Sequence, residues 1–527
     1  MNLILTNARI FTCDPSQPWA TALAIANDKI IAVGSDADMD GVRLPNAERI
    51  NLNGAFVTPG LIDAHTHLLS TGYALQRIDL PREPSHDLVI ETVRRRAATT
   101  PSGKWILGRG WVRVPWSADG TPSAADLDPA TDAHPVAITA ASGHALWVNS
   151  AGLRQCGITA STADPYGGQI VRDATGAPTG LLLEEALGLV YDKLPPFTFA
   201  EEEAAVLGAM RAMNQAGLTG THCMDGSGGI GSFQAYQRVR SSHKQTLRVV
   251  KNLPAQDMDA VLGAGIRSGF GDAWLRVGGV KFFADGALGP RTALMIAPYE
   301  NQPANYGMRT YEKEQLFEDI GRVNAAGLSA IVHAIGDQAN RDVLDAMAAA
   351  AAGATPGLRN RIEHCQVLHP DDIPRFAVQN IIASVQPIHA TQDMQVADLF
   401  WGARSKGAYA FRSLADSGAR LAFGSDAPVE VFDPLVGLHA AVTRRRADGT
   451  PGPDGWYPEQ RVTIEEAIQA YTLGAAYAGG MEREIGSLEA GKYADLTVLS
   501  RDLTRIPGDE ILGAKVERVM VGGDWVV

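Results

Sequence analysis

A regular alternation of short apolar segments with helical stretches constrains the fold most, and it runs from residue 200 onward. Seven of the apolar segments are typical of strands: 218–222, 246–251, 275–283, 328–333, 361–366, 381–386 and 421–425. Strands that alternate with helices predict a parallel sheet, because each parallel connection needs a crossover. With 55–65 as an earlier strand the count reaches eight, which predicts an α/β fold, the (β/α)₈ TIM barrel.

The rest of the chain divides into two terminal β segments and one long insertion. Residues 1–56 and 483–527 hold short apolar runs separated by turn residues. Neither piece can bury both faces of a sheet alone, so we expect one small composite β-sandwich, with two separate edge hairpins as the alternative. The barrel then occupies 57–482. Within it, the Pro-, Gly- and Trp-rich residues 70–200 predict an insertion after barrel strand 1, folded over the barrel mouth.

The charge balance excludes several classes of partner. The net charge of −13 disfavours binding to nucleic acid or to an anionic membrane. No apolar run approaches the roughly 18 residues of a membrane span, and the first residues resemble a strand rather than a signal peptide. Four scattered Cys without a CxxC pair favour a reducing compartment. We therefore expect a cytoplasmic protein that acts on a small molecule, with a homodimer as the default assembly.

The strongest local motif is a His-x-His at the end of a predicted strand. Side chains alternate along a strand, so His65 and His67 point the same way and can bind one metal together. A His-x-His alone is a weak signal, and a merely polar strand end is the alternative. Its place at the carboxyl end of a barrel strand favours metal ligands, because active sites of this fold lie at that end.

Other predicted strands end in residues that suit the same chemistry. They are Lys281, His333, His364 and Asp426. Lys281 stands among apolar residues, where a buried ammonium is costly. Six such side chains at one rim are hard to assign to packing, and they predict a metal centre. The alternative to a part in the metal centre is that Lys281 is an unmodified amine that pairs with Asp285 or Asp426.

Several segments resemble the amidohydrolase superfamily, and the resemblance covers nearly the whole chain. Within it, the YtcJ-like branch that includes N-substituted formamide deformylase is similar in VKFFADGALGPRTA, HAIGD, IEHC, GSDAPVE, SGHALWVNSAGL and GSLEAGKYADLTVLS. The branch often reads Asp-Gly-His where this chain has Ser142-Gly143-His144, and Trp-Asp where it has Trp111-Val112. These departures lie in the insertion, so they bear on the substrate and not on the metal ligands.

The resemblance implies a centre of two divalent metal ions, with Zn²⁺ as the default, although Mn, Fe and Ni suit the same ligand types. The implied ligands are His65, His67 and Asp426 for the more buried metal, His333 and His364 for the second, and a carbamylated Lys281 that bridges both. A metal-bridging hydroxide would attack the carbonyl of an amide, with Asp426 as general base and then acid.

The substrate stays open at this stage. N-formyl amines are the first expectation from the resemblance, beside other amides, cyclic amides and carbamates. A single-metal deaminase of the same superfamily is one alternative, although it usually needs a His-x-x-Glu, and His333 is followed by Ala334-Ile335-Gly336-Asp337 without that Glu. A catalytically silent barrel is the other, and it fits poorly with six filled ligand positions.

Three further residues are candidates for substrate binding. His144 could contact the substrate or be a core histidine, and Arg291 could bind the substrate or pair with an acid. Trp111 could wall an apolar pocket or belong to the core. The remaining histidines near strand ends are interpreted as structural, with the first of them as the foremost exception: His222, His389 and His439.

Overall fold

The computed structural model describes residues 2–81, 83–117, 120–226 and 231–527. Contacts divide the chain into two compact units. One combines Met1–Thr71 with Val206–Val527, and the other is Gly72–Ala205. Among the helices of the described ranges, none is both long and apolar enough to cross a membrane.

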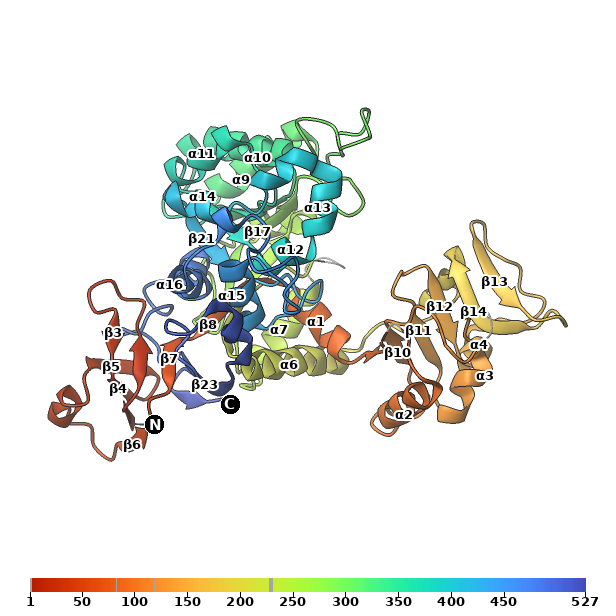
Figure 1. The fold of residues 1–527 in the computed structure, drawn as a ribbon, viewed down its shortest axis with the longest axis horizontal. Coiled ribbons are helices and arrows are strands. Elements are labelled where there is room, and N and C mark those ends of the chain that lie inside the picture. Colours follow the sequence, from red (N-terminus) through yellow and green to blue (C-terminus); the bar gives the residue numbers. More distant parts are fainter. Residues whose placement is uncertain (1, 82, 118–119, 227–230) are drawn as a thin grey trace. The chain divides into compact units, whose positions relative to one another are not determined.

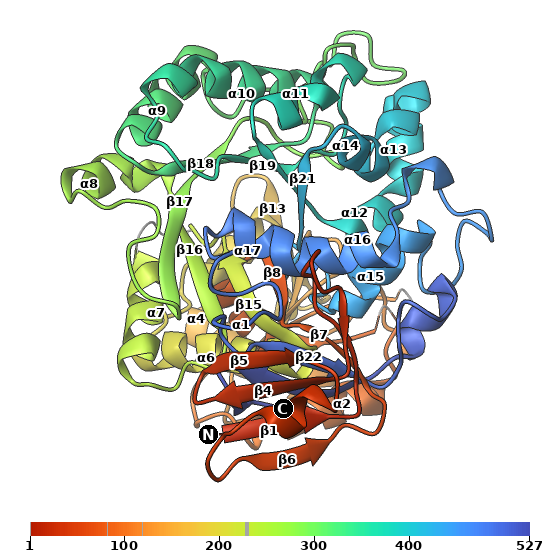
Figure 2. The ribbon, with the colours of Figure 1, turned by 90° about the vertical axis from the view of Figure 1, so that its left-hand side faces the viewer.

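The first unit is built around an eight-stranded parallel sheet, in the order β21-β20-β19-β18-β17-β16-β15-β8 (Figures 1 and 2). Its strands are β8 (Leu61–Thr66), β15 (Leu218–Cys223), β16 (Arg248–Pro254), β17 (Leu275–Phe283), β18 (Ser329–Ala334), β19 (Arg361–His364), β20 (Ile382–Val385) and β21 (Arg420–Phe423). Most of these strands are buried along their whole length, because both faces of a parallel sheet are covered. The predicted TIM barrel is confirmed.

The first and last strands approach each other at their carboxyl ends. The amide of Asp426 donates to the carbonyl of His65, and the amide of His67 donates to the carbonyl of Ala427, each at 2.7 Å. Thr66 and Ala427 form a parallel bridge at the same place. These contacts bring the seam of the barrel together beside the His-x-His motif.

Helices lie outside the strands, as Figure 2 shows for α9, α10 and α11. In α9 the buried Leu316, Ile320 and Val323 recur at helical spacing and form the face that is withdrawn from solvent. The helices of this unit include α7 (Gly231–Ser241), α8 (Met258–Gly263), α9 (Lys313–Ala325), α10 (Asp337–Ala350), α11 (Ile373–Val378), α12 (Pro387–Gln392), α13 (Met394–Trp401), α14 (Phe411–Asp416), α15 (Pro434–Thr443), α16 (Ile464–Gln469) and α17 (Ala475–Ala478).

Strands from both ends of the chain form two further sheets. One has the order β5-β4-β1-β6, and the other has β24-β23-β22-β7-β2-β3. In the second sheet β7 (Phe56–Pro59) pairs antiparallel with β22 (Leu496–Leu499), so N- and C-terminal segments share one ladder. Their apolar side chains form a common cluster that includes Leu5, Val57 and Met520. The contacts assign both sheets to the same unit as the barrel, so their standing as a separate domain stays a prediction.

The remaining strands of those two sheets are short. Their bounds are β1 (Asn2–Thr6), β2 (Arg9–Phe11), β3 (Trp19–Ala20), β4 (Ala22–Ala26), β5 (Lys29–Gly34), β6 (Glu48–Asn51), β23 (Val516–Val521) and β24 (Asp524–Trp525).

The second unit contains a six-stranded mixed sheet of its own, in the order β13-β14-β12-β11-β10-β9. The strands are β9 (Ile78–Asp79), β10 (Ile106–Arg109), β11 (Val136–Thr139), β12 (Ala145–Val148), β13 (Gly168–Arg172) and β14 (Pro178–Glu184). Helices α2 (His86–Ala97), α3 (Ala124–Leu127) and α4 (Ser150–Cys156) accompany this sheet. Two apolar clusters fill this unit. That it covers the barrel mouth stays a prediction.

Candidate metal centre

A cavity of about 350 Å³ lies at the carboxyl ends of the barrel strands, and all six predicted ligands line it. His65 lies in β8, Lys281 in β17, His333 in β18 and His364 in β19. The other two, His67 and Asp426, come shortly after β8 and β21. Parallel strands bring their carboxyl ends to one rim, which explains how residues so far apart in sequence meet.

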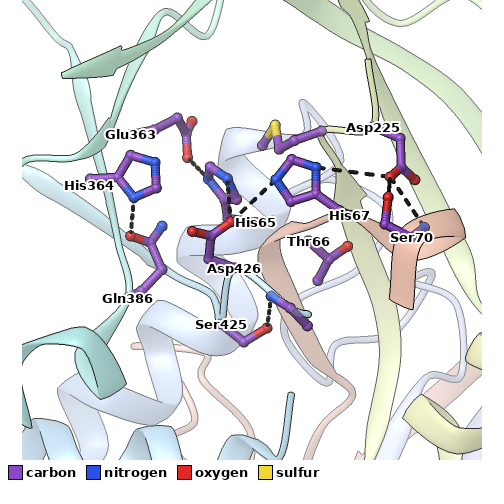
Figure 3. Close-up of polar contacts among 12 residues, drawn as sticks. His65, Thr66, His67, Ser70, Asp225, Glu363, His364, Gln386, Ser425 and Asp426 are labelled. Carbon is purple, nitrogen blue, oxygen red and sulfur yellow. Dashed lines mark hydrogen bonds and ion pairs between the residues drawn. The ribbon is translucent and has the colours of Figure 1, made fainter. Parts of the chain in front are cut away.

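Three of these side chains meet at the seam of the barrel (Figure 3). The Nε2 atoms of His65 and His67 each lie 3.3 Å from Oδ1 of Asp426. All three donor atoms fall within 4.8 Å of one another, which suits ligands of one metal ion. Asp426 has a φ of 64°, a conformation that is unusual for a residue other than glycine and that marks a constrained position.

The carboxylate of Asp426 has a third histidine, on its other oxygen. His389, in α12 after β20, places Nε2 3.4 Å from Oδ2, and His364, His389 and Asp426 form a second cluster with metal-binding spacing. The sequence alone assigns His389 a structural role, whereas in the structure its side chain lines the cavity. Its place shortly after a barrel strand was a signal, but a weaker one than a place in the strand itself, because the residue lies in a helix.

His333 and His364 stand side by side, with ring centroids 4.6 Å apart. His333 donates from Nε2 to the carbonyl of Gly286 at 2.9 Å, and His364 donates from Nδ1 to Gln386 at 2.9 Å. Burial lowers the pKa of His333 to about 3 and that of His364 well below its usual value. Both imidazoles are therefore neutral and keep a lone pair, which is the form that binds metals.

Lys281 is buried, and its Nζ makes no hydrogen bond to any described residue. The amine lies 4.8 Å from the ring centroid of Phe283. Asp285, one partner considered from the sequence, instead accepts backbone N–H groups from Leu294, Ile335 and Gly336 at 2.8–3.0 Å. Burial lowers the pKa of Lys281 to about 8. An unpartnered buried ammonium is costly, so the position suits an amine that becomes modified.

A buried ion pair supports His65 from behind. The Nδ1 of His65 donates to Oε2 of Glu363 at 2.6 Å, which directs Nε2 into the cavity. Glu363 also pairs with Arg361 at 2.7 Å. Burial alone would raise the pKa of Glu363, but Arg361 and His65 lower it to about 2. The criterion that singled out Lys281, a charge inside a buried strand, would have found Arg361 and Glu363 too.

Two other buried groups complete this part of the barrel. Asp225, which sequence reasoning missed, lies 3.9 Å from Nδ1 of His67 and accepts from Ser70 (Figure 3). It also accepts a hydrogen bond from the hydroxyl of Tyr236. His222, the foremost exception among the structural histidines, bonds to Arg361 at 2.7 Å from its Nδ1. It lies in the interior of the barrel and is not among the residues that line the cavity.

The three candidate substrate residues lie in different settings. Trp111 is buried in the core of Gly72–Ala205 and donates to the carbonyl of Ile138. His144, in the same unit, is exposed and pairs with Glu184 at 2.8 Å. Arg291, in the barrel unit, lies 4.5 Å from the ring centroid of Phe400. His439 is buried beside Asp509, at 3.9 Å.

The eight-stranded barrel with a cluster of histidines and an aspartate at its carboxyl rim defines a metal-dependent hydrolase. The sequence profile of the amidohydrolase family matches residues 48–527. The chain belongs to the amidohydrolase family.

Curated relatives span most of the chain. Protein LONG AFTER FAR-RED 3 of Arabidopsis thaliana is 35% identical to this chain, and the match covers 95% of this chain and 87% of that protein. The chain is 33% identical to YtcJ of Bacillus subtilis (strain 168), named as a candidate amidohydrolase, over 92% of this chain and 91% of that one. N-substituted formamide deformylase of Arthrobacter pascens is 29% identical, over 99% and 97%.

A solved structure has the same fold. An uncharacterized metal-dependent hydrolase from Pyrococcus furiosus superposes with a TM-score of 0.77 at 27% identity, covering 96% of this chain and all of the other.

Proposed function

We propose that this protein hydrolyses a C–N bond in a small amide with two divalent metal ions. The observation that carries the proposal is the single cavity lined by His65, His67, Lys281, His333, His364 and Asp426. The donor set supports it too, because imidazoles, one carboxylate and one amine without a hydrogen-bond partner among the described residues suit divalent metals.

Each side chain has a part in holding the metals. His65, His67 and Asp426 would bind the first, and His333 and His364 the second. Lys281 would bridge both as a carbamate, formed when its neutral amine attacks CO₂ and releases a proton. Zn²⁺ or a similar ion supplies Lewis acidity and lowers the pKa of a bound water.

Asp426 is the residue that moves the proton in this proposal. Its Oδ1 faces His65 and His67, while its Oδ2 faces His389. The second oxygen can therefore take a proton from the attacking water and return it to the departing nitrogen, as general base and then acid. His389 would keep that oxygen oriented.

N-formyl amines are the first substrates to test, because one relative over nearly the whole chain is named as a deformylase of N-substituted formamides. The screen uses metal-loaded enzyme with N-formyl, N-acyl, lactam and carbamate compounds, and a chelator-treated sample as control. Amide hydrolysis with near two metals per chain is expected. Near one metal, with deamination instead, would favour the single-metal alternative, and two metals without any hydrolysis would favour a silent barrel.

Lys281→Ala tests the bridge directly. The variant should bind one metal or fewer instead of about two, and small carboxylic acids should partly restore the second. Metal content is measured by elemental analysis, with the exposed Lys244→Ala as matched control. Two tightly bound metals in Lys281→Ala would remove the lysine from the centre.

A further inference from the structure

A second cavity adjoins the predicted metal ligands. It measures about 380 Å³, and it shares three lining residues with the first cavity: His67, Lys281 and Phe283. Phe283 ends β17, is 46% exposed, and lies with its ring centroid 5.3 Å from that of His333. Because Phe283 lines both cavities, its ring stands between two spaces that meet at the predicted ligands.

The two cavities share residues that end or follow β8 and β17 and extend from there over different strands of the barrel. The second is lined by residues at or after the ends of β15, β16 and β17, among them Met224, Pro254 and Ala255. Beyond the residues at β8, β17 and the loop after β17, the first is lined by residues that end or follow β18, β19, β20 and β21, among them His389 and Glu430. A molecule bound across the centre would therefore place one half in each cavity.

The two cavities differ in their carboxylates, because Asp and Glu side chains line the first and none is among the described residues that line the second. Met224, Pro254, Phe283 and Tyr311 give the second cavity apolar surfaces. The hydroxyl of Tyr311 donates a hydrogen bond to Asp319 at 2.6 Å, so Tyr311 contributes its aromatic ring to the wall of the cavity. An alkyl or aryl group would gain free energy by leaving water for this space.

The first cavity instead carries carboxylates beyond the ligand set. Asp393 and Glu430 line it together with Asp426 and His389. Asp393 accepts a hydrogen bond from Tyr409 at 2.6 Å. Carboxylates at this place favour a group that becomes positively charged, because opposite charges attract most strongly where water is partly excluded.

We infer that the substrate is an N-acyl amine whose acyl chain is longer than formyl, bound with the acyl group in the second cavity and the amine in the first. The assignment rests on the proposed function. Asp426 must lie beside the departing nitrogen to protonate it, and Asp426 lines the first cavity but not the second. The amine product then leaves past Asp393 and Glu430 as an ammonium ion. A formyl group, which has only hydrogen on its carbonyl carbon, would leave the second cavity empty.

Two matched variants test the orientation. Ala255 lines the second cavity and Ala287 lines the first, and both are half-buried, so Ala255→Phe and Ala287→Phe each add one phenyl ring to one cavity. The exposed Ala348→Phe on α10 is the control for adding a ring elsewhere. The substrates are N-hexylhexanamide, N-hexylformamide and N-methylhexanamide.

The expected results are changes in ratios of kcat/KM. The wild type should prefer N-hexylhexanamide to N-hexylformamide. Ala255→Phe should lower that preference at least about tenfold, since contacts of one methylene already discriminate on this scale. Ala287→Phe should instead lower the preference for N-hexylhexanamide over N-methylhexanamide by a similar factor. Ala348→Phe should change neither ratio.

Several outcomes overturn the assignment. Hydrolysis of the formamide but not of the hexanamide by the wild type would leave the proposed function standing and refute the acyl cavity. An effect of Ala255→Phe on the amine ratio would reverse the orientation. If no amide is cleaved, the proposed function fails, and calorimetry still decides the cavity: hexanoate should bind at least about tenfold more weakly to Ala255→Phe than to Ala287→Phe, and equal binding refutes it.

Discussion

The barrel buries charged side chains, whereas no Asp, Glu, Lys or Arg is among the buried residues described in the unit Gly72–Ala205. The barrel places Lys281, Arg361 and Glu363 inside buried strands, where charges are costly. The other unit fills its interior with apolar clusters and leaves His144 exposed beside Glu184. Under the proposed function, the buried charges beside the cavity serve chemistry, whereas the core of the other unit serves stability. Variants in the first should change metal binding and turnover, and variants in the second should change unfolding.

Asp426→Asn should have the largest effect in the barrel. The amide keeps an oxygen that can face His65 and His67, but it cannot accept and return a proton. We expect kcat to fall by about 10²–10⁴ with metal content retained, as for the loss of a general acid–base group. Turnover and elemental analysis check this, with the exposed Asp371→Asn as control. Full turnover in Asp426→Asn would remove the residue from proton transfer.

Trp111→Ala should have the largest effect in the other unit. The ring centroids of Trp111 and Trp147 lie 6.1 Å apart, and the indole of Trp111 donates to the carbonyl of Ile138, so its removal leaves a cavity and breaks one hydrogen bond. We expect a loss of about 3–5 kcal/mol in the free energy of unfolding, with metal content unchanged. Urea unfolding followed by circular dichroism measures it, beside the fully exposed Tyr166→Ala. Loss of metal in Trp111→Ala would break the comparison.

Glu363→Gln tests whether buried charge in the barrel serves the metal centre. Glutamine keeps the shape but loses the charge that holds His65 Nδ1–H and neutralises Arg361. Metal affinity should fall about 10–100-fold, as when a group that orients a ligand is lost. Competition with a chelator measures it, and the exposed Glu517→Gln is the matched control. Unchanged affinity would assign Glu363 to stability alone.

The same contrast explains what the sequence could predict. Strand ends of a parallel barrel converge on one rim, so His65, His333 and Asp426 could be grouped without any knowledge of contacts. His389 was missed because it lies in a helix after the strand. Its approach to the second oxygen of Asp426 depends on how that helix begins. Glu363 was missed because it acts through His65 and does not line the cavity itself.

No rule of this kind applies to the other unit. Its sheet mixes parallel and antiparallel pairs, as in β10 with β11 and β11 with β12, so the strand ends do not converge on one edge. Trp111 and His144 therefore stayed open between two interpretations, and only the packing decides that Trp111 belongs to the core. Aromatic composition alone cannot distinguish a wall of a pocket from the interior of a sheet.

His144→Ala should have the smallest effect, and it sharpens the comparison most finely. The ion pair with Glu184 is exposed on both sides, so stability should change by less than about 1 kcal/mol. If the imidazole binds the substrate, as proposed from the sequence, the loss of one hydrogen bond should raise KM about 2–10-fold and leave kcat in place. Steady-state kinetics separate the two constants. A constant KM would leave this unit without a substrate contact at His144, whereas a fall in kcat would give it a part in the chemistry that the barrel otherwise performs alone.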